Sequence, residues 1–130
     1  MSNKTDSKVP HFEAKSVMEI GTLIFFKKFA LMKVKEGVHL GIDQIQKLEI
    51  ILSQYYKDQP YGYICDKANS YSVNPLGYRA LNNISQLKCF AVIKEYSNGH
   101  DIQVEKHFIK KPFNVFQTFE EAVQWIESFI

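Results

Sequence analysis

The feature that most constrains this chain is an amphipathic stretch set between two short apolar runs. From Gln44 to Tyr56 the apolar residues follow the spacing of one helical face: Ile45, Leu48, Leu52 and Tyr55. One apolar run, Phe29 to Lys35, precedes this stretch, and another, Tyr61 to Cys65, follows it. Two strands joined through a helix predict a parallel crossover, because parallel strands need a long connection. The sequence therefore predicts an α/β sheet.

Two further apolar runs lie before the first of these strands. They cover Ser16 to Ile20 and Leu23 to Phe26, and Gly21-Thr22 separates them. Short strands joined by tight turns predict an antiparallel meander that ends with the run Phe29 to Lys35. The alternation of lysine with apolar residues at the end of that run predicts a strand near an edge of the sheet.

The second half of the chain carries clear helix boundaries. Asn74-Pro75 combines an N-cap residue with a proline at the first helical position, which predicts a helix that runs to about Asn82. Thr118 and Glu121 have the spacing of a capping box for the last helix. Asp43 is the predicted N-cap of the helix that follows it. The remaining predicted elements are a strand over Lys88–Glu95, a helix over Asp101–Lys111 and a strand over Asn114–Gln117.

The predicted helix over Asp101–Lys111 has an imperfect apolar face, because Glu105 falls within it. His100 and His107 lie on one side of this helix, but about 10 Å apart along its axis. Two ligands that far apart do not share one metal ion without a third element. We therefore expect neither a metal nor a cofactor, and the sequence contains no motif for catalysis.

Composition limits the size and the partners of the fold. The 130 residues are 45% apolar, which is enough for one domain. We expect that domain over residues 13–130 and a flexible tail over residues 1–12. A net charge of +2 argues against a nucleic-acid partner. The most apolar stretch, Leu23 to Met32, is shorter than the roughly 20 residues that span a membrane. We expect a cytoplasmic protein without membrane insertion.

The two cysteines, Cys65 and Cys89, both fall in apolar runs. Their spacing indicates neither a zinc site nor a disulfide framework. We expect them in the core. If their strands are neighbours, the two thiols come close enough to form an oxidation-sensitive pair.

Three segments resemble a known superfamily. The C-terminal pattern F-x-x-F-E-E-A-x-x-W-I starts at Phe116, and the order of predicted elements is β-β-β-α-β-α-β-α-β-α. Together they resemble the SpoIIAA-like superfamily, which includes STAS anti-sigma-factor antagonists and CRAL-TRIO-like proteins. N-S-Y-S-V-N-P from Asn69 and K-K-P-F from Lys110 are similar to segments of small uncharacterised proteins of Bacteroidetes. The resemblance covers Val17 to Ile130.

The resemblance implies a mixed sheet flanked by helices and a regulatory or protein-binding role without enzymatic turnover. STAS domains carry an Asp-Ser-Ser-Gly motif between a central strand and the next helix, and a serine there is phosphorylated. Asp66 to Pro75 takes that place in this chain, but the motif is absent. Ser70 and Ser72 are therefore only positional candidates for phosphorylation. The sequence leaves open whether the chain forms a homodimer.

The candidate site lies between the buried strand that ends near Cys65 and the helix that Asn74 opens. Ligands of open α/β sheets bind beyond the carboxyl ends of the strands, where the loop Asp66–Val73 is expected. Tyrosines, including Tyr63, offer contact area to a protein partner. The candidate binding residues are Asn69, Ser70, Tyr71, Ser72, Asn74, Tyr78 and Arg79.

Two other interpretations stay open for these residues. The polar residues of the loop are also typical of turns and caps that bond their own backbone. Arg79, the only arginine in the chain, is also typical of a surface residue packed on an aromatic ring. An alternative function is a carrier for a small apolar or anionic ligand, in which Arg79 and the helix N-terminus hold the anionic end.

Overall fold

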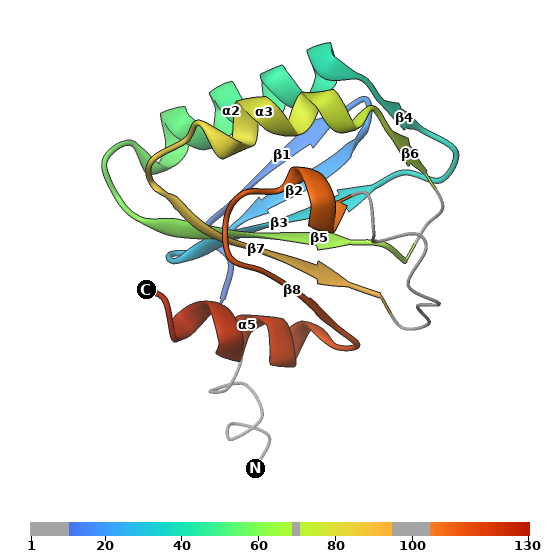
Figure 1. Cartoon of the computed structure of the whole chain (residues 1–130). Helices are drawn as coiled ribbons and strands as arrows, with labels where there is room; N and C mark the ends of the chain where they lie inside the picture. Colours follow the sequence, from blue (N-terminus) through green and yellow to red (C-terminus); the bar gives the residue numbers. More distant parts are fainter. Residues whose placement is uncertain (1–10, 69–70, 95–104) are drawn as a thin grey trace.

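A six-stranded mixed sheet forms the centre of the molecule (Figure 1). The computed structural model describes residues 11–68, 71–94 and 105–130. Within these ranges the strands of the main sheet lie in the order β1-β2-β3-β5-β7-β8. Their bounds are β1 Ala14–Met18, β2 Gly21–Phe25, β3 Phe29–Val34, β5 Tyr61–Asp66, β7 Leu87–Ile93 and β8 Phe113–Phe116.

Strand directions confirm the predicted crossover. β1, β2 and β3 form the antiparallel meander, whereas β3, β5, β7 and β8 run parallel to one another. The carboxyl ends of these four parallel strands therefore share one edge of the sheet, which we call the carboxyl edge. The prediction that β3 lies near an edge is wrong, since β3 pairs with β2 on one side and β5 on the other.

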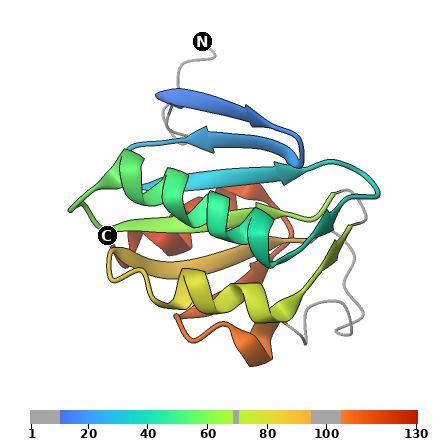
Figure 2. The same ribbon diagram turned by 90° about the horizontal axis from the view of Figure 1, so that it is seen from above.

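Helices cover both faces of the sheet. The helices α2, Ile42–Tyr56, and α3, Tyr78–Asn82, lie side by side on one face, and α5, Phe119–Glu127, lies on the other (Figures 1 and 2). Thr118 and Glu121 form the predicted capping box at the start of α5. The α/β class is thus confirmed, and over the described residues the main strands and helices follow the predicted order, to which the structure adds β4, His39–Leu40, β6, Ser72–Val73, and the 3-10 helix η1, Pro75–Gly77.

Each face of the sheet buries a separate apolar core. The larger core lies under α2 and α3, where Leu48 and Leu52 pack over side chains such as Leu23 and Met32. The smaller core lies under α5 and includes Ile126. Ile45, Leu48 and Leu52 of the predicted stripe are buried against the sheet, but the fourth buried residue of α2 is Tyr56, and the predicted Tyr55 is only half-buried.

The hairpin between β1 and β2 turns earlier than predicted. Met18 pairs with Gly21, so Glu19 and Ile20 form the turn, and Gly21 begins β2. Gly21 has a φ of 154°, and a Cβ there would lie 2.1 Å from the carbonyl oxygen of Lys33. Glycine is needed because the backbone of β3 approaches too closely for any side chain.

The start of α2 also differs from the prediction. The helix begins at Ile42, and its N-cap is Gly41 rather than Asp43. The backbone N–H of Gly41 donates to Oε1 of Gln44 at 3.0 Å. Asp43 lies in the first turn, where its negative charge favours the positive end of the helix dipole.

A second, two-stranded sheet joins two loops at the carboxyl edge. β4, His39–Leu40, pairs in parallel with β6, Ser72–Val73. The prediction of a continuous loop over Asp66–Val73 is therefore wrong at its end. Two residues of extended chain carry too little apolar pattern to be identified as a strand, and their partner is remote in sequence.

Two predicted segments lie partly outside the described residues. Residues 105–108 are helical, and the rest of the predicted helix up to residue 104 lies outside the described residues. The predicted tail shares only His11 and Phe12 with the described ranges, and both are exposed. Within those ranges, no helix has the length and apolar character needed to cross a membrane.

Buried tyrosines predict a loss of stability in alkali. Burial, followed by the hydrogen bond to Glu13 and its charge, raises the pKa of Tyr55 to about 12. Burial also raises the pKa of Tyr56, Tyr61 and Tyr78. In the unfolded chain these phenols ionise near about 10, so above that pH the unfolded state binds fewer protons than the folded state. The free energy of unfolding should fall from about pH 10 upward, as denaturant titrations would measure. Equal stability at about pH 8 and pH 11 would contradict this prediction.

Candidate functional site

The carboxyl edge carries the segment that the sequence singles out. After β5 ends at Asp66, the chain crosses this edge and returns through β6 into the 3-10 helix η1, Pro75–Gly77, and α3. We call the described residues 66–68 and 71–79 the edge segment. Because ligands of open α/β sheets bind beyond the carboxyl ends of the strands, this segment has the expected position for a site.

A buried ion pair holds the inner side of the edge segment. Nζ of Lys67 lies 2.9 Å from Oε2 of Glu105, and both side chains are largely shielded from solvent. The hydroxyl of Tyr78 donates to the same oxygen at 3.1 Å. Glu105 is only 3% exposed, and its Oε1 has no hydrogen-bond partner. Removing either member of such a pair leaves an uncompensated charge in the interior.

Tyr71 extends this cluster toward the core. Its ring lies under Nζ of Lys67, 4.4 Å from the ring centroid, and its hydroxyl hydrogen-bonds Sγ of Cys65. Burial raises the pKa of the Cys65 thiol and that of the Tyr71 phenol. A thiol with a raised pKa is a poor nucleophile at neutral pH, so the environment of Cys65 is structural in character.

The space beside this cluster is nearly filled. The cavity enclosed by Tyr63, Cys65, Tyr71, Tyr78 and Phe90, together with residues of α2 and α3, has a volume of about 10 Å³. A cavity of that size holds about one water molecule. As far as the described residues enclose it, this space therefore has no room for an organic substrate.

The outer side of the edge segment is exposed. Oγ of Ser72 lies 2.8 Å from Nδ1 of His39, across the β4–β6 pair. Oδ1 of Asn74 accepts from the backbone N–H of Leu76, which confirms Asn74 as the cap. Leu76 is 46% exposed, and Arg79, one turn later, is exposed as well.

The structure separates the predicted binding residues into several groups. Asn69 and Ser70 lie outside the described residues. Tyr78 is only 6% exposed, so its side chain belongs to the core and to Glu105 rather than to a solvent-facing surface. Tyr63 is 2% exposed, so the expected contact area for a partner is absent there too. Tyr71 is half-buried.

Ser72 and Arg79 have exposed side chains. Ser72 contacts His39. No ion pair or cation–π contact within the described ranges involves Arg79. Of the predicted binding residues in those ranges, these two offer side chains to a partner most openly.

The prediction about the cysteines is half right. Both are buried. β5 and β7 are neighbours, but Cys65 pairs with Val92. Cys89 pairs with Gly62, which lies three residues before Cys65 in β5. Because side chains alternate along a strand, Cys65 enters the larger core and Cys89 the smaller one. The sheet therefore separates the two thiols and prevents an intramolecular pair.

Lys67 and Glu105 are the residues that sequence reasoning missed at this site. Glu105 gave a signal, because a carboxylate on an apolar helical face needs a buried partner. Lys67 gave none, since a lysine in a polar loop is ordinarily solvated. His107 is exposed, and the described residues contain no cluster of His, Cys, Asp and Glu side chains suited to a metal ion.

Comparison with known proteins identifies the fold. The chain resembles the crystal structure of an uncharacterised protein of the DUF3478 family, with a SpoIIAA-like fold, from Shewanella loihica PV-4. The match covers 91% of this chain and 95% of that one, with a TM-score of 0.51 and 11% identity. No protein-family profile and no curated protein matches the sequence. The chain therefore has a SpoIIAA-like fold.

Proposed function

We propose that this chain is a non-enzymatic protein-interaction module of the STAS type. Its partner binds the outer side of the edge segment and the neighbouring start of α2. We call this area the partner surface, and it consists of His39, Ile42, Ser72, Leu76 and Arg79. The observation that carries the proposal is that Leu76 and Arg79 are exposed although the edge segment around them is held by several contacts.

The composition of the partner surface suits a protein partner. Ile42 and Leu76 are 38% and 46% exposed, and they come from α2 and η1, which pack on each other. Arg79 follows Leu76 at a spacing of one helical turn, so the two side chains share a side of the segment. Arginine beside apolar side chains is typical of the residues that dominate binding energy at interfaces. The expected partner offers an apolar side chain and a carboxylate.

The structure beneath the partner surface favours rigid docking. The Lys67–Glu105 pair and the bond between Tyr71 and Cys65 hold the edge segment from the inside. The β4–β6 pair and the Asn74 cap hold it at its end. A surface that is already ordered loses less entropy when a partner binds.

The small space beside Tyr63, Tyr78 and Phe90 argues against the alternative of a ligand carrier at that place. A carrier needs a pocket of about 300–1,000 Å³. The space beside Tyr63, Tyr78 and Phe90 is about 10 Å³. An apolar ligand would have to displace core side chains that are already packed.

Affinity capture from the native host tests this proposal. Leu76→Asp and Arg79→Ala should each weaken binding of the partner at least about 30-fold. Proteins that the wild-type chain retains should therefore be lost with either variant. Ile50→Asp is the matched control, since Ile50 lies on α2 away from the partner surface and is 51% exposed. The same proteins should remain with this control. An unchanged set of proteins with Leu76→Asp, or an equal loss with the control, would contradict the partner surface.

A further inference from the structure

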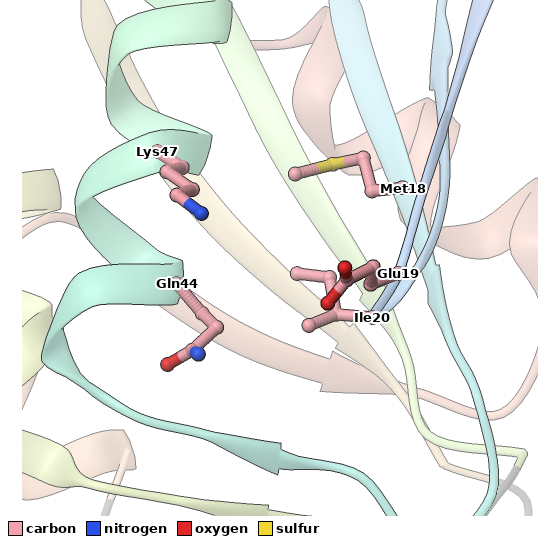
Figure 3. Close-up of a pocket in the computed structure, with 5 residues that line it drawn as sticks. All are labelled: Met18, Glu19, Ile20, Gln44 and Lys47. Atoms are coloured by element: carbon pink, nitrogen blue, oxygen red, sulfur yellow. The ribbon is translucent and has the colours of Figure 1, made fainter.

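A groove on the far side of α2 carries a second, independent feature. It lies between the β1–β2 hairpin and the first turns of α2, and its volume is about 220 Å³. We call it the hairpin groove, and it is lined by Met18, Glu19, Ile20, Gln44 and Lys47. In Figure 3, Lys47 extends from the helix toward the three residues of the hairpin, whereas the amide of Gln44 turns away from them.

The walls of the hairpin groove carry opposite charges. Glu19 and Lys47 are both exposed and stand on opposite sides (Figure 3). Within the described ranges, neither side chain forms an ion pair. The carboxylate of Glu19 and the ammonium group of Lys47 can therefore both bind a ligand that lies in the groove.

Gln44 and Lys47 form the helical wall of the hairpin groove. Oε1 of Gln44 accepts from the backbone N–H of Gly41, which fixes the orientation of the amide. Gln44 and Lys47 belong to the first turns of α2, whose dipole favours a negative charge at this end.

The floor of the hairpin groove is apolar. Ile20 is 7% exposed and belongs to the larger core, and the half-buried Met18 packs against that core. Thioether and aliphatic side chains accept aliphatic groups of varied shape. The volume lies below the about 300–1,000 Å³ of pockets for drug-sized molecules, so the occupant is small.

We infer that the hairpin groove binds a free aliphatic α-amino acid. Lys47 binds its carboxylate, Glu19 binds its ammonium group, and its side chain lies on Met18 and Ile20. The groove opens at the carboxyl edge, as ligand sites of α/β sheets do. It lies across α2 from the partner surface, so this inference does not depend on the proposed function.

An NMR titration of the ¹⁵N-labelled full chain with L-leucine tests the inference. The amides of residues 18–20 and 44–47 should shift with a saturable dependence on leucine. 4-Methylpentanoate lacks the ammonium group, isopentylamine lacks the carboxylate, and glycine lacks the side chain. Each of these compounds should bind at least about tenfold more weakly, because each loses one of the three contacts.

Variants of the two charged walls complete the test. Glu19→Gln and Lys47→Met should each weaken leucine binding at least about tenfold. Lys28→Met is the matched control, since Lys28 is an exposed lysine in the turn between β2 and β3, and it should leave binding unchanged. The inference is contradicted if these segments show no saturable shifts, or if leucine and 4-methylpentanoate bind with equal affinity. It is also contradicted if both wall variants bind leucine as tightly as the wild type.

Discussion

Replacing Glu105 by alanine is expected to lower the free energy of unfolding by about 3–5 kcal/mol. Glu105 is the buried partner of Lys67 and accepts the hydroxyl of Tyr78. Its removal leaves the ammonium group of Lys67, whose side chain is only 9% exposed, without a counter-charge. Denaturant titration monitored by circular dichroism measures the change.

A double variant separates the cost of an unpaired charge from the value of the ion pair. Lys67→Met/Glu105→Leu removes both charges and keeps similar volumes. Such replacements are often neutral or stabilising, so the double variant should recover most of the loss. A Glu105→Ala cost below about 1 kcal/mol, or a double variant as unstable as the single one, would show that the pair is solvated.

Replacing Gly21 by alanine is expected to cost about 2–4 kcal/mol. The new Cβ would meet the carbonyl oxygen of Lys33 at 2.1 Å, and the φ of 154° is one that side chains rarely adopt. The neighbouring atom belongs to the backbone of β3, so relief requires a shift of the β2–β3 pairing. Thermal and denaturant unfolding of the variant measure the loss.

Gly37 provides the control for this substitution. Its φ of 77° also favours glycine, but a Cβ there meets no atom within 4 Å. Gly37→Ala should therefore cost only about 1 kcal/mol, the price of the backbone conformation alone. If the two substitutions cost the same, the close approach of β3 to Gly21 does not limit stability.

Much of the fold follows from local sequence pattern. The stripe of α2, the apolar run of β5, the Asn74-Pro75 start and the capping box at Thr118 are each decided by residues within a few positions of one another. The parallel crossover then follows from the order of the elements. Gly21 shows what local sequence does not predict. Whether this glycine lies in the turn or in the strand is decided by the approach of β3, which is not a neighbour in the sequence.

The site is harder to predict because its contacts join distant segments. Lys67 and Glu105 are 38 positions apart in the chain, and His39 and Ser72 are 33 apart. No periodicity links such pairs. Tyr78 illustrates the consequence: its polar tip suggested a surface residue, whereas its hydroxyl finds a buried carboxylate. Ser72 in β6 and Arg79 in α3 remain candidates, since both side chains are exposed.

Photo-crosslinking in the native host tests the partner surface most directly. A photoreactive phenylalanine analogue is introduced at Leu76 in one sample and at Ile50 in another, since both side chains are about half exposed but only Leu76 lies on the partner surface. After irradiation, the Leu76 sample should yield a discrete crosslinked protein that the Ile50 sample lacks. No discrete product at Leu76, or the same products at both positions, would contradict the proposed interaction module.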